Sequence, residues 1–151
     1  KIDNSDGIIA SRYIKDSIIN PKPTLERKIA SRMFNFLIKI IINLPYKDTQ
    51  CGAKVFRRKV IEKIISYLKF SKWAYDVELL YNCKRFGFKI KEIPTVWSDE
   101  KYSKINFMTA GPMMALAVLR LRLINSSFKG LIKFYDKLVD RLLKIIRKKS
   151  K

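Results

Sequence analysis

The stretch Lys47-Asp48-Thr49-Gln50-Cys51-Gly52-Ala53-Lys54-Val55-Phe56-Arg57 joins a long apolar helix pattern to a short strand pattern. Taken alone, it is typical of a helix-to-strand turn. Asp48 would cap backbone amides there, and Gly52 would supply a backbone angle that other residues avoid. An aromatic and acidic cluster, Trp73-Ala74-Tyr75-Asp76-Val77-Glu78, follows it. A function for the stretch therefore depends on the order of motifs around it.

Composition limits the classes of function that are open. The 151 residues have room for one domain, and a hydrophobic content of 48% excludes a disordered chain. The net charge of +20 indicates an anionic partner, which is nucleic acid, anionic lipid or a phosphorylated substrate. The chain has no histidine, so the commonest general base and metal ligand is absent. Its two cysteines, Cys51 and Cys83, form no metal-type pair and favour a reduced cytosolic setting.

Hydrophobic periodicity predicts a mixed α/β arrangement. In chain order it indicates a buried strand at 8–10, a loop at 15–24, a helix at 24–43, a strand at 53–56, helices at 58–68 and 73–86, an edge strand at 88–97 and a charged loop at 98–104. The first strand has nothing before it to pair with. We therefore expect the chain to be a fragment whose N-terminal half is missing.

Three helical segments favour a membrane surface. The helix at 24–43 is too charged and too short to span a bilayer, which needs about 20 apolar residues, but it suits the interface. A core helix of a soluble domain is the alternative. The apolar run from Ile105 is interrupted by Gly111-Pro112 and ends in arginines, which predicts an interfacial helix at 105–125. Residues 126–151 form a basic amphipathic pattern, typical of a membrane surface or a partner groove.

Several short motifs occur in one order along the chain. They are Ser11-Arg12-Tyr13, Leu25-Glu26-Arg27, Ser31, Asp48-Thr49-Gln50-Cys51-Gly52, Trp73 to Leu80 and Ser103-Lys104. This series resembles the C-terminal half of family 2 glycosyltransferases that load a sugar onto a polyprenyl phosphate, the dolichyl-phosphate β-glucosyltransferase and dolichol-phosphate mannosyltransferase group. The resemblance covers residues 8 to about 124 and leaves out the terminal helix.

The resemblance implies a fold class and a domain division. We expect an α/β fold, a partial GT-A (Rossmann-like) glycosyltransferase domain with few strands and several amphipathic interfacial helices. Residues 1–104 would be the acceptor-side part of that domain, 105–125 an interfacial helix and 126–151 a basic tail helix.

The resemblance also implies an activity. The chain would take part in the inverting transfer of glucose or mannose from UDP-glucose or GDP-mannose to dolichyl or undecaprenyl phosphate. It would work on an anionic membrane surface, at the cytosolic face of the endoplasmic reticulum or plasma membrane. Arg12, Arg27 and Ser31 would hold the acceptor phosphate. Asp48 would act at the sugar carbon, and the donor would meet three residues, Gln50, Ser103 and Lys104.

Physical reasoning supports the acceptor residues and leaves the role of Asp48 open. Free amides and the dipole at a helix N-terminus attract phosphate, and Arg27 and Ser31, four residues apart, share a helix face near that end. A phosphate monoester has a second pKa of about 6, so the acceptor is already largely anionic at neutral pH. Asp48 would remove a residual proton, orient the acceptor, or stabilise positive charge at the anomeric carbon.

The metal site is the main departure from the family. Its members bind Mg or Mn through an Asp-x-Asp motif on the donor half, and this sequence has none. We expect Mg or Mn in the complete enzyme, with ligands outside this chain, and no metal site within it. The chain alone is therefore predicted to be inactive and incompletely folded.

Two other functions remain open at this point. A membrane-surface module that binds lipid phosphate without catalysis shares every feature above. A nucleic-acid-binding domain would explain the net charge of +20. It is disfavoured because the sequence has no helix-turn-helix, zinc or RNP-type signature and its basic residues interleave with apolar faces. We predict no nucleic-acid partner.

Overall fold

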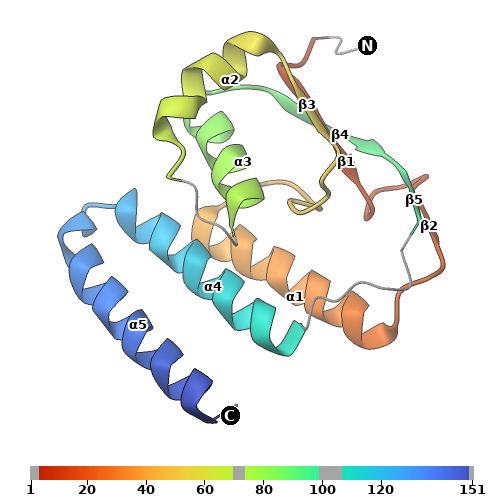
Figure 1. Cartoon of the computed structure of the whole chain (residues 1–151). Coiled ribbons are helices and arrows are strands. Elements are labelled where there is room, and N and C mark those ends of the chain that lie inside the picture. The colour runs from red at the N-terminus through yellow and green to blue at the C-terminus, as the bar shows by residue number, and fades with distance from the viewer. Residues whose placement is uncertain (1–3, 70–73, 99–106, 150–151) are drawn as a thin grey trace.

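A central strand organises the main sheet. The computed structural model describes residues 4–69, 74–98 and 107–149 (Figure 1). Strand β1 (Gly7–Ser11) pairs antiparallel with β3 (Lys54–Phe56) on one side and parallel with β4 (Ile90–Pro94) on the other. The predicted strands at 8–10 and 53–56 are confirmed. Because β1 and β4 run parallel with Ser11 opposite Pro94, their C-terminal ends meet at the same edge.

A second, two-stranded sheet corrects two predictions. Strands β2 (Ile18–Asn20) and β5 (Val96–Ser98) pair in parallel. The prediction that 15–24 is all loop is therefore wrong at Ile18–Asn20, which gain strand structure by pairing with a distant segment. The single strand expected at 88–97 is instead two strands, β4 and β5. Strand β4 ends at Pro94, which has no backbone N–H to donate, and lies at the edge of its sheet as predicted.

Helix α1 (Leu25–Ile42) has the predicted ends. Thr24 caps it by accepting the N–H of Arg27 at 3.4 Å, and Asn43 ends it in a left-handed conformation with φ 57°. One face packs into the core through Ile38 and Ile42. The opposite side carries apolar side chains that are 49 to 72% exposed. They are Leu25, Ile29, Met33, Phe36 and Ile40.

Helices α2 (Arg58–Ile64) and α3 (Tyr75–Arg85) supply much of the core. Val60, Ile64, Val77 and Leu80 are fully buried in one cluster with Ile9 of β1. The predicted helix at 58–68 tightens into a 3-10 turn, η1 (Ile65–Tyr67). Gly87, with φ 73°, stands just past the end of α3. Trp73, the predicted start of that helix, lies outside the described residues.

The C-terminal helices extend a helical layer. Helix α4 (Phe107–Ile124) packs beside α1, and α5 (Ile132–Lys149) packs along α4 after a short turn, η2 (Lys129–Leu131) (Figure 1). The helix predicted at 105–125 is present as α4, which continues through Gly111-Pro112. Burial of Val118 and Leu121 in the core helps to hold α4 against the domain. No helix within the described residues is long and apolar enough to cross a membrane.

The architecture confirms the predicted fold class. Within the described residues, five α-helices accompany a small mixed sheet and a two-stranded sheet. This mixed α/β arrangement is consistent with a partial Rossmann-like glycosyltransferase domain. The C-terminal edge of β1, next to the loop that holds Asp48, is where a ligand is expected in open α/β sheets.

Candidate active site around Asp48

Asp48 and Arg12 form a buried ion pair at the C-terminal edge of β1. The Nε and Nη2 atoms of Arg12 donate to Oδ2 and Oδ1 of Asp48 at 2.7 and 3.0 Å. The backbone N–H of Arg12 donates to Oδ2 at 3.0 Å, and that of Gln50 donates to Oδ1 at 3.3 Å. The Asp48 side chain is 0% exposed and that of Arg12 is 17% exposed. Four hydrogen bonds therefore fix one carboxylate in place.

This environment keeps Asp48 ionised. Burial on its own would raise the pKa of Asp48, but the hydrogen bonds and charge of Arg12 outweigh it, and the pKa lies below its ordinary value. Burial would lower the pKa of Arg12, while the hydrogen bond and charge of Asp48 raise it above its ordinary value. A carboxylate with a lowered pKa is a weak base, so Asp48 is better suited to act as a fixed negative charge.

Two further side chains hold the loop that carries Asp48. Glu92 of β4 accepts the backbone N–H of Lys47 at 3.0 Å and that of Asp48 at 3.1 Å. Asn35 of α1 accepts the hydroxyl of Thr49 at 3.2 Å and its backbone N–H at 3.5 Å. The loop is thus connected to β1, β4 and α1 at once. Such cross-links preorganise a site before any ligand arrives.

Aromatic rings and cations gather beside the ion pair. Tyr13 and Ser31 share a hydroxyl–hydroxyl hydrogen bond of 2.6 Å. The Arg32 guanidinium lies 4.3 Å from the centre of the Tyr13 ring, and that of Arg12 lies 5.4 Å from it. Arg12 also lies 5.2 Å from the centre of the Trp97 ring. These separations are those of cation–π contacts, which hold guanidinium groups in place without neutralising them.

Two buried polar atoms in this region have no hydrogen-bond partner among the described residues. They are Oγ of Ser11, which precedes Arg12, and Nδ2 of Asn35, whose other amide atom holds Thr49. Most buried polar groups in native proteins are paired, so an unpaired one calls for an explanation. Their position beside the Asp48 loop favours a functional site here.

The structure brings together several of the predicted site residues. Asp48, Arg12 and Gln50 are hydrogen-bonded to one another. Ser31 joins them through Tyr13, the residue after Arg12. Arg27 stands one helical turn before Ser31 in the first turn of α1. Ser103 and Lys104 lie outside the described residues. The roles assigned to all these residues stay predictions.

Sequence reasoning missed four residues of this region. They are Glu92, Tyr13, Arg32 and Asn35. A signal existed for Tyr13, which follows Arg12 at the end of a predicted strand. No local signal marks Glu92, because its place beside the loop arises only when β4 pairs in parallel with β1.

Residues next to the Asp48 loop pack in the core or stabilise the loop. Cys51 is buried in the core. Asp76 forms an ion pair with Lys54 at 2.8 Å. The same ammonium donates to the carbonyl of Cys51, so this pair braces the C-terminal side of the loop.

The described residues offer no metal site. Among them, no three His, Cys, Asp or Glu side chains lie close enough together to hold a metal ion. Asp48 is already held by four hydrogen bonds and Glu92 by two backbone amides. The arrangement therefore does not fit a Mg or Mn ion at this loop.

Known proteins resemble the chain over most of its length. Dolichyl-phosphate beta-glucosyltransferase of Dictyostelium discoideum is 30% identical over 125 residues, 81% of this chain and 38% of that protein. Glycosyltransferase AglD of Haloferax volcanii is 28% identical over 115 residues, 76% of this chain and 18% of that protein. The dolichyl-phosphate beta-glucosyltransferase of Saccharomyces cerevisiae is 37% identical over 90 residues, 60% of this chain and 27% of that protein. No protein-family model and no solved structure matches the chain.

The predicted resemblance to family 2 glycosyltransferases is therefore confirmed. The proteins that carry it are for the most part named dolichyl-phosphate beta-glucosyltransferases. The chain spans no more than 38% of the length of the curated relatives described above. What it resembles is thus one part of those enzymes.

Proposed function

We propose that this chain is the acceptor-side part of an enzyme that transfers a sugar from a nucleotide sugar to a polyprenyl phosphate, with inversion at the sugar carbon. The observation that carries the proposal is the buried Asp48 carboxylate, fixed by Arg12 at the C-terminal edge of β1. The similarity to dolichyl-phosphate beta-glucosyltransferases supports it.

The acceptor phosphate would bind between the start of α1 and Arg12. A guanidinium has five N–H donors, and the bonds to Asp48 use two of those on Arg12, so three remain for a second anion. Ser31 and Arg27 add donors from one face of the first turns of α1, where the helix dipole also favours an anion. Arg32, held against Tyr13, adds positive charge.

Asp48 would act as a fixed charge. An oxygen of the acceptor phosphate attacks the anomeric carbon while the bond to the nucleoside diphosphate breaks, and the diphosphate leaves with the electron pair. Positive charge grows on the sugar ring as that bond stretches, and an ionised carboxylate beside it stabilises the transition state. A base is not required, because an acceptor with a second pKa of about 6 is already largely anionic. The lowered pKa of Asp48 supports this role over proton removal.

For the donor we propose the contacts that the resemblance implies. Gln50, next to Asp48, and Ser103 and Lys104 would meet the nucleotide diphosphate, and lysine would serve it as a point charge. Mg or Mn would supply further positive charge to the diphosphate, held by residues outside this chain. The relatives' names favour UDP-glucose over GDP-mannose as the donor.

The exposed side of α1 supports a membrane setting. Its apolar stripe, formed by Leu25, Ile29, Met33, Phe36 and Ile40, lies on the side of α1 opposite the core-facing Ile38 and Ile42. Three exposed basic residues, Lys28, Arg32 and Lys39, flank it. A polyprenyl chain is embedded in a bilayer, so an interfacial helix would bring its phosphate close to the start of α1. The cytosolic face of the endoplasmic reticulum or plasma membrane is the proposed location.

The direct test measures transfer by the complete gene product that carries this sequence. We expect it to move labelled sugar from UDP-glucose, with Mg or Mn, onto dolichyl phosphate. Arg27→Ala should raise the KM for dolichyl phosphate by about tenfold or more, because a hydrogen bond to a charged group contributes about 1.5–3 kcal/mol. Arg58→Ala, an exposed arginine of α2, is the matched control and should leave KM unchanged.

The same assay separates the alternatives. Transfer from GDP-mannose alone would assign mannose in place of glucose. Binding of dolichyl phosphate without transfer from either donor would overturn the enzyme in favour of a lipid-phosphate-binding module. Salt-sensitive binding of nucleic acid with no binding of dolichyl phosphate would overturn both.

A further inference from the structure

Helix α5 and the residue before it present a second exposed apolar stripe. Leu131, just before the helix, and Phe134, Leu138 and Leu142 within it are 43 to 70% exposed. They recur every three or four residues, so they form one line along the helix. We call these four residues the α5 stripe. Large apolar side chains gathered on a surface in this way mark an interaction site.

A different face of α5 attaches it to the protein. Arg120 of α4 donates from Nε and Nη2 to the Asp136 carboxylate at 2.7 and 2.9 Å. The Tyr135 hydroxyl donates to the carbonyl of Leu116 at 2.7 Å. Asp136 and Tyr135 therefore turn toward α4. With Asp136 and Tyr135 bonded to α4, the α5 stripe lies on another face of the helix and stays exposed.

Basic side chains lie on the other flank of the α5 stripe. In the segment 132–149, seven residues are Lys or Arg and two are Asp. Four exposed members form what we call the α5 ridge, namely Lys133, Lys137, Arg141 and Lys144. The helix thus has a face on α4, an apolar stripe and a cationic ridge. A stripe edged by cations is complementary to a surface that is apolar inside and anionic outside.

We propose that the α5 stripe and the α5 ridge dock this protein on an anionic phospholipid bilayer, with the stripe among the upper acyl chains and the ridge at the headgroups. A second copy of the chain is a poorer occupant. Both copies would carry a net charge of +20, and their ridges would repel across the contact. This inference deepens the proposed function, on which it rests for the expectation that the acceptor lies in a bilayer.

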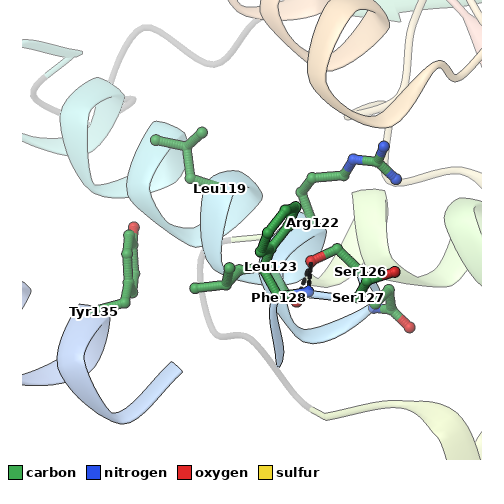
Figure 2. Close-up of a pocket in the computed structure, with 8 residues that line it drawn as sticks. Leu119, Arg122, Leu123, Ser126, Ser127, Phe128 and Tyr135 are labelled. Carbon is green, nitrogen blue, oxygen red and sulfur yellow. Dashed lines mark hydrogen bonds between the residues drawn. The ribbon is translucent and has the colours of Figure 1, made fainter. Parts of the chain in front are cut away.

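A cavity at the start of α5 fits the same partner. It has a volume of about 710 Å³ and lies between the end of α4 and the start of α5 (Figure 2). Leu119, Leu123, Phe128 and Tyr135 give it an apolar lining, and Arg122 adds a cation. Figure 2 shows the Arg122 guanidinium on the side away from Tyr135. The acyl chain of a phospholipid would fit the apolar part of the cavity, and the phosphate of its headgroup would lie at Arg122.

The test is co-sedimentation with vesicles of the complete gene product that carries this sequence. One set is phosphatidylcholine alone and the other contains about 30% phosphatidylserine, to supply an anionic surface. We expect binding to the anionic set. The stripe variant Phe134→Ala, Leu138→Ala, Leu142→Ala should lose at least tenfold in affinity, because apolar burial drives insertion. Alanine keeps the helix, since it has the highest helix propensity.

A ridge variant tests the electrostatic half. Replacing each of the four ridge residues by Gln should weaken binding on the order of fivefold per residue on anionic vesicles, and much less at high salt. The apolar control is the triple variant Ile18→Ala, Val55→Ala, Ile65→Ala, which removes exposed side chains outside α5. The charge control replaces four exposed lysines outside α5 by Gln, namely Lys15, Lys63, Lys89 and Lys91. Both controls should bind as the unmodified chain does.

Each result decides the inference. Loss of binding in the stripe and ridge variants, with unchanged melting temperatures and unaffected controls, supports it. Equal binding of the stripe variant and the unmodified chain overturns it. A dimer that dissociates in the stripe variant, without vesicle binding, overturns it in favour of a second copy. Failure of the proposed function is distinguishable, because vesicle binding needs no donor and transfer to a short, water-soluble polyprenyl phosphate needs no bilayer.

Discussion

Two Arg–Asp pairs in this protein have nearly the same geometry and different surroundings. Arg12 holds Asp48 with bonds of 2.7 and 3.0 Å, and Arg120 holds Asp136 with bonds of 2.7 and 2.9 Å. The side chains of the first pair are 17 and 0% exposed, whereas those of the second are 39 and 41% exposed. Only the first carboxylate also accepts backbone amides. The difference shows that a distance alone does not say what an ion pair does.

Burial decides the consequences. In the first pair, removal of one partner leaves a charge that water reaches poorly, and such breaks are strongly destabilising. In the second pair, water solvates either partner when the other is lost, and exposed pairs contribute little. The first pair fixes the loop that carries Asp48. The second pair attaches the exposed helix α5 to α4.

The largest predicted effect is the loss of Asp48. Asp48→Ala should lower the free energy of unfolding by about 3–5 kcal/mol, because it leaves the Arg12 cation largely buried without its anion. Asp136→Ala is the matched variant and should cost about 0–1 kcal/mol. Urea denaturation measures both. Equal losses in the two variants would show that burial does not separate the pairs.

Loss of Glu92 should have the next largest effect on stability. Glu92→Ala removes the acceptor of the Lys47 and Asp48 amides and should cost about 1.5–3 kcal/mol, the range for hydrogen bonds to a charged group. Glu62→Ala, on the exposed surface of α2, is the control and should cost less than about 1 kcal/mol. If Glu92→Ala lowered the free energy of unfolding no more than Glu62→Ala, the contact of the Asp48 loop with β4 would not stabilise the protein.

The pH dependence of stability should report the ion pair of Asp48. The pKa of Asp48 in the folded protein lies below that of an unfolded Asp, about 3.9. Its contribution is therefore complete above the unfolded pKa and is lost as the pH falls through the folded pKa. The free energy of unfolding should fall as the pH drops from about 5 through the folded pKa of Asp48, and less steeply in Asp48→Asn. Identical slopes in the two proteins would contradict the lowered pKa.

The smallest predicted effect is the difference in the salt dependence of the two coupling energies. A double-mutant cycle on Arg120 and Asp136 should give a coupling energy below about 1 kcal/mol that shrinks further in about 1 M salt. The same cycle on Arg12 and Asp48 should change much less, because buried pairs are screened less. Equal screening of both couplings would mean that water reaches Asp48.

Local patterns predicted most of the elements. The Thr24 cap, the apolar periodicity and Asn43 located α1, and the alternation of polar and apolar residues located β4. Strand β2 was missed because Ile18–Asn20 lies in a polar segment and becomes a strand only by pairing with β5. The apolar run from Ile105 located α4, but the packing of Val118 and Leu121 into the core was not visible locally.

The site was predictable in part. The resemblance pointed to Arg12, Asp48 and Gln50, which do lie together. It did not indicate that Arg12 and Asp48 form an ion pair, because that contact joins residues 36 positions apart. Nor did it indicate Glu92, which reaches the loop only through the parallel pairing of β4 with β1. Contacts between distant segments are set by the fold, and sequence periodicity carries no record of them.

The most direct test of the central claim is the turnover rate of Asp48→Asn in the complete gene product that carries this sequence. The assay contains UDP-glucose, Mg or Mn and saturating dolichyl phosphate. We predict that kcat falls by at least about 100-fold, the size of effect seen when one electrostatic stabiliser is removed. Asp136→Asn should stay within about threefold. Retained binding of dolichyl phosphate by Asp48→Asn would show that the site is still folded. An unchanged kcat in that variant would contradict the assignment of Asp48 to the reacting sugar.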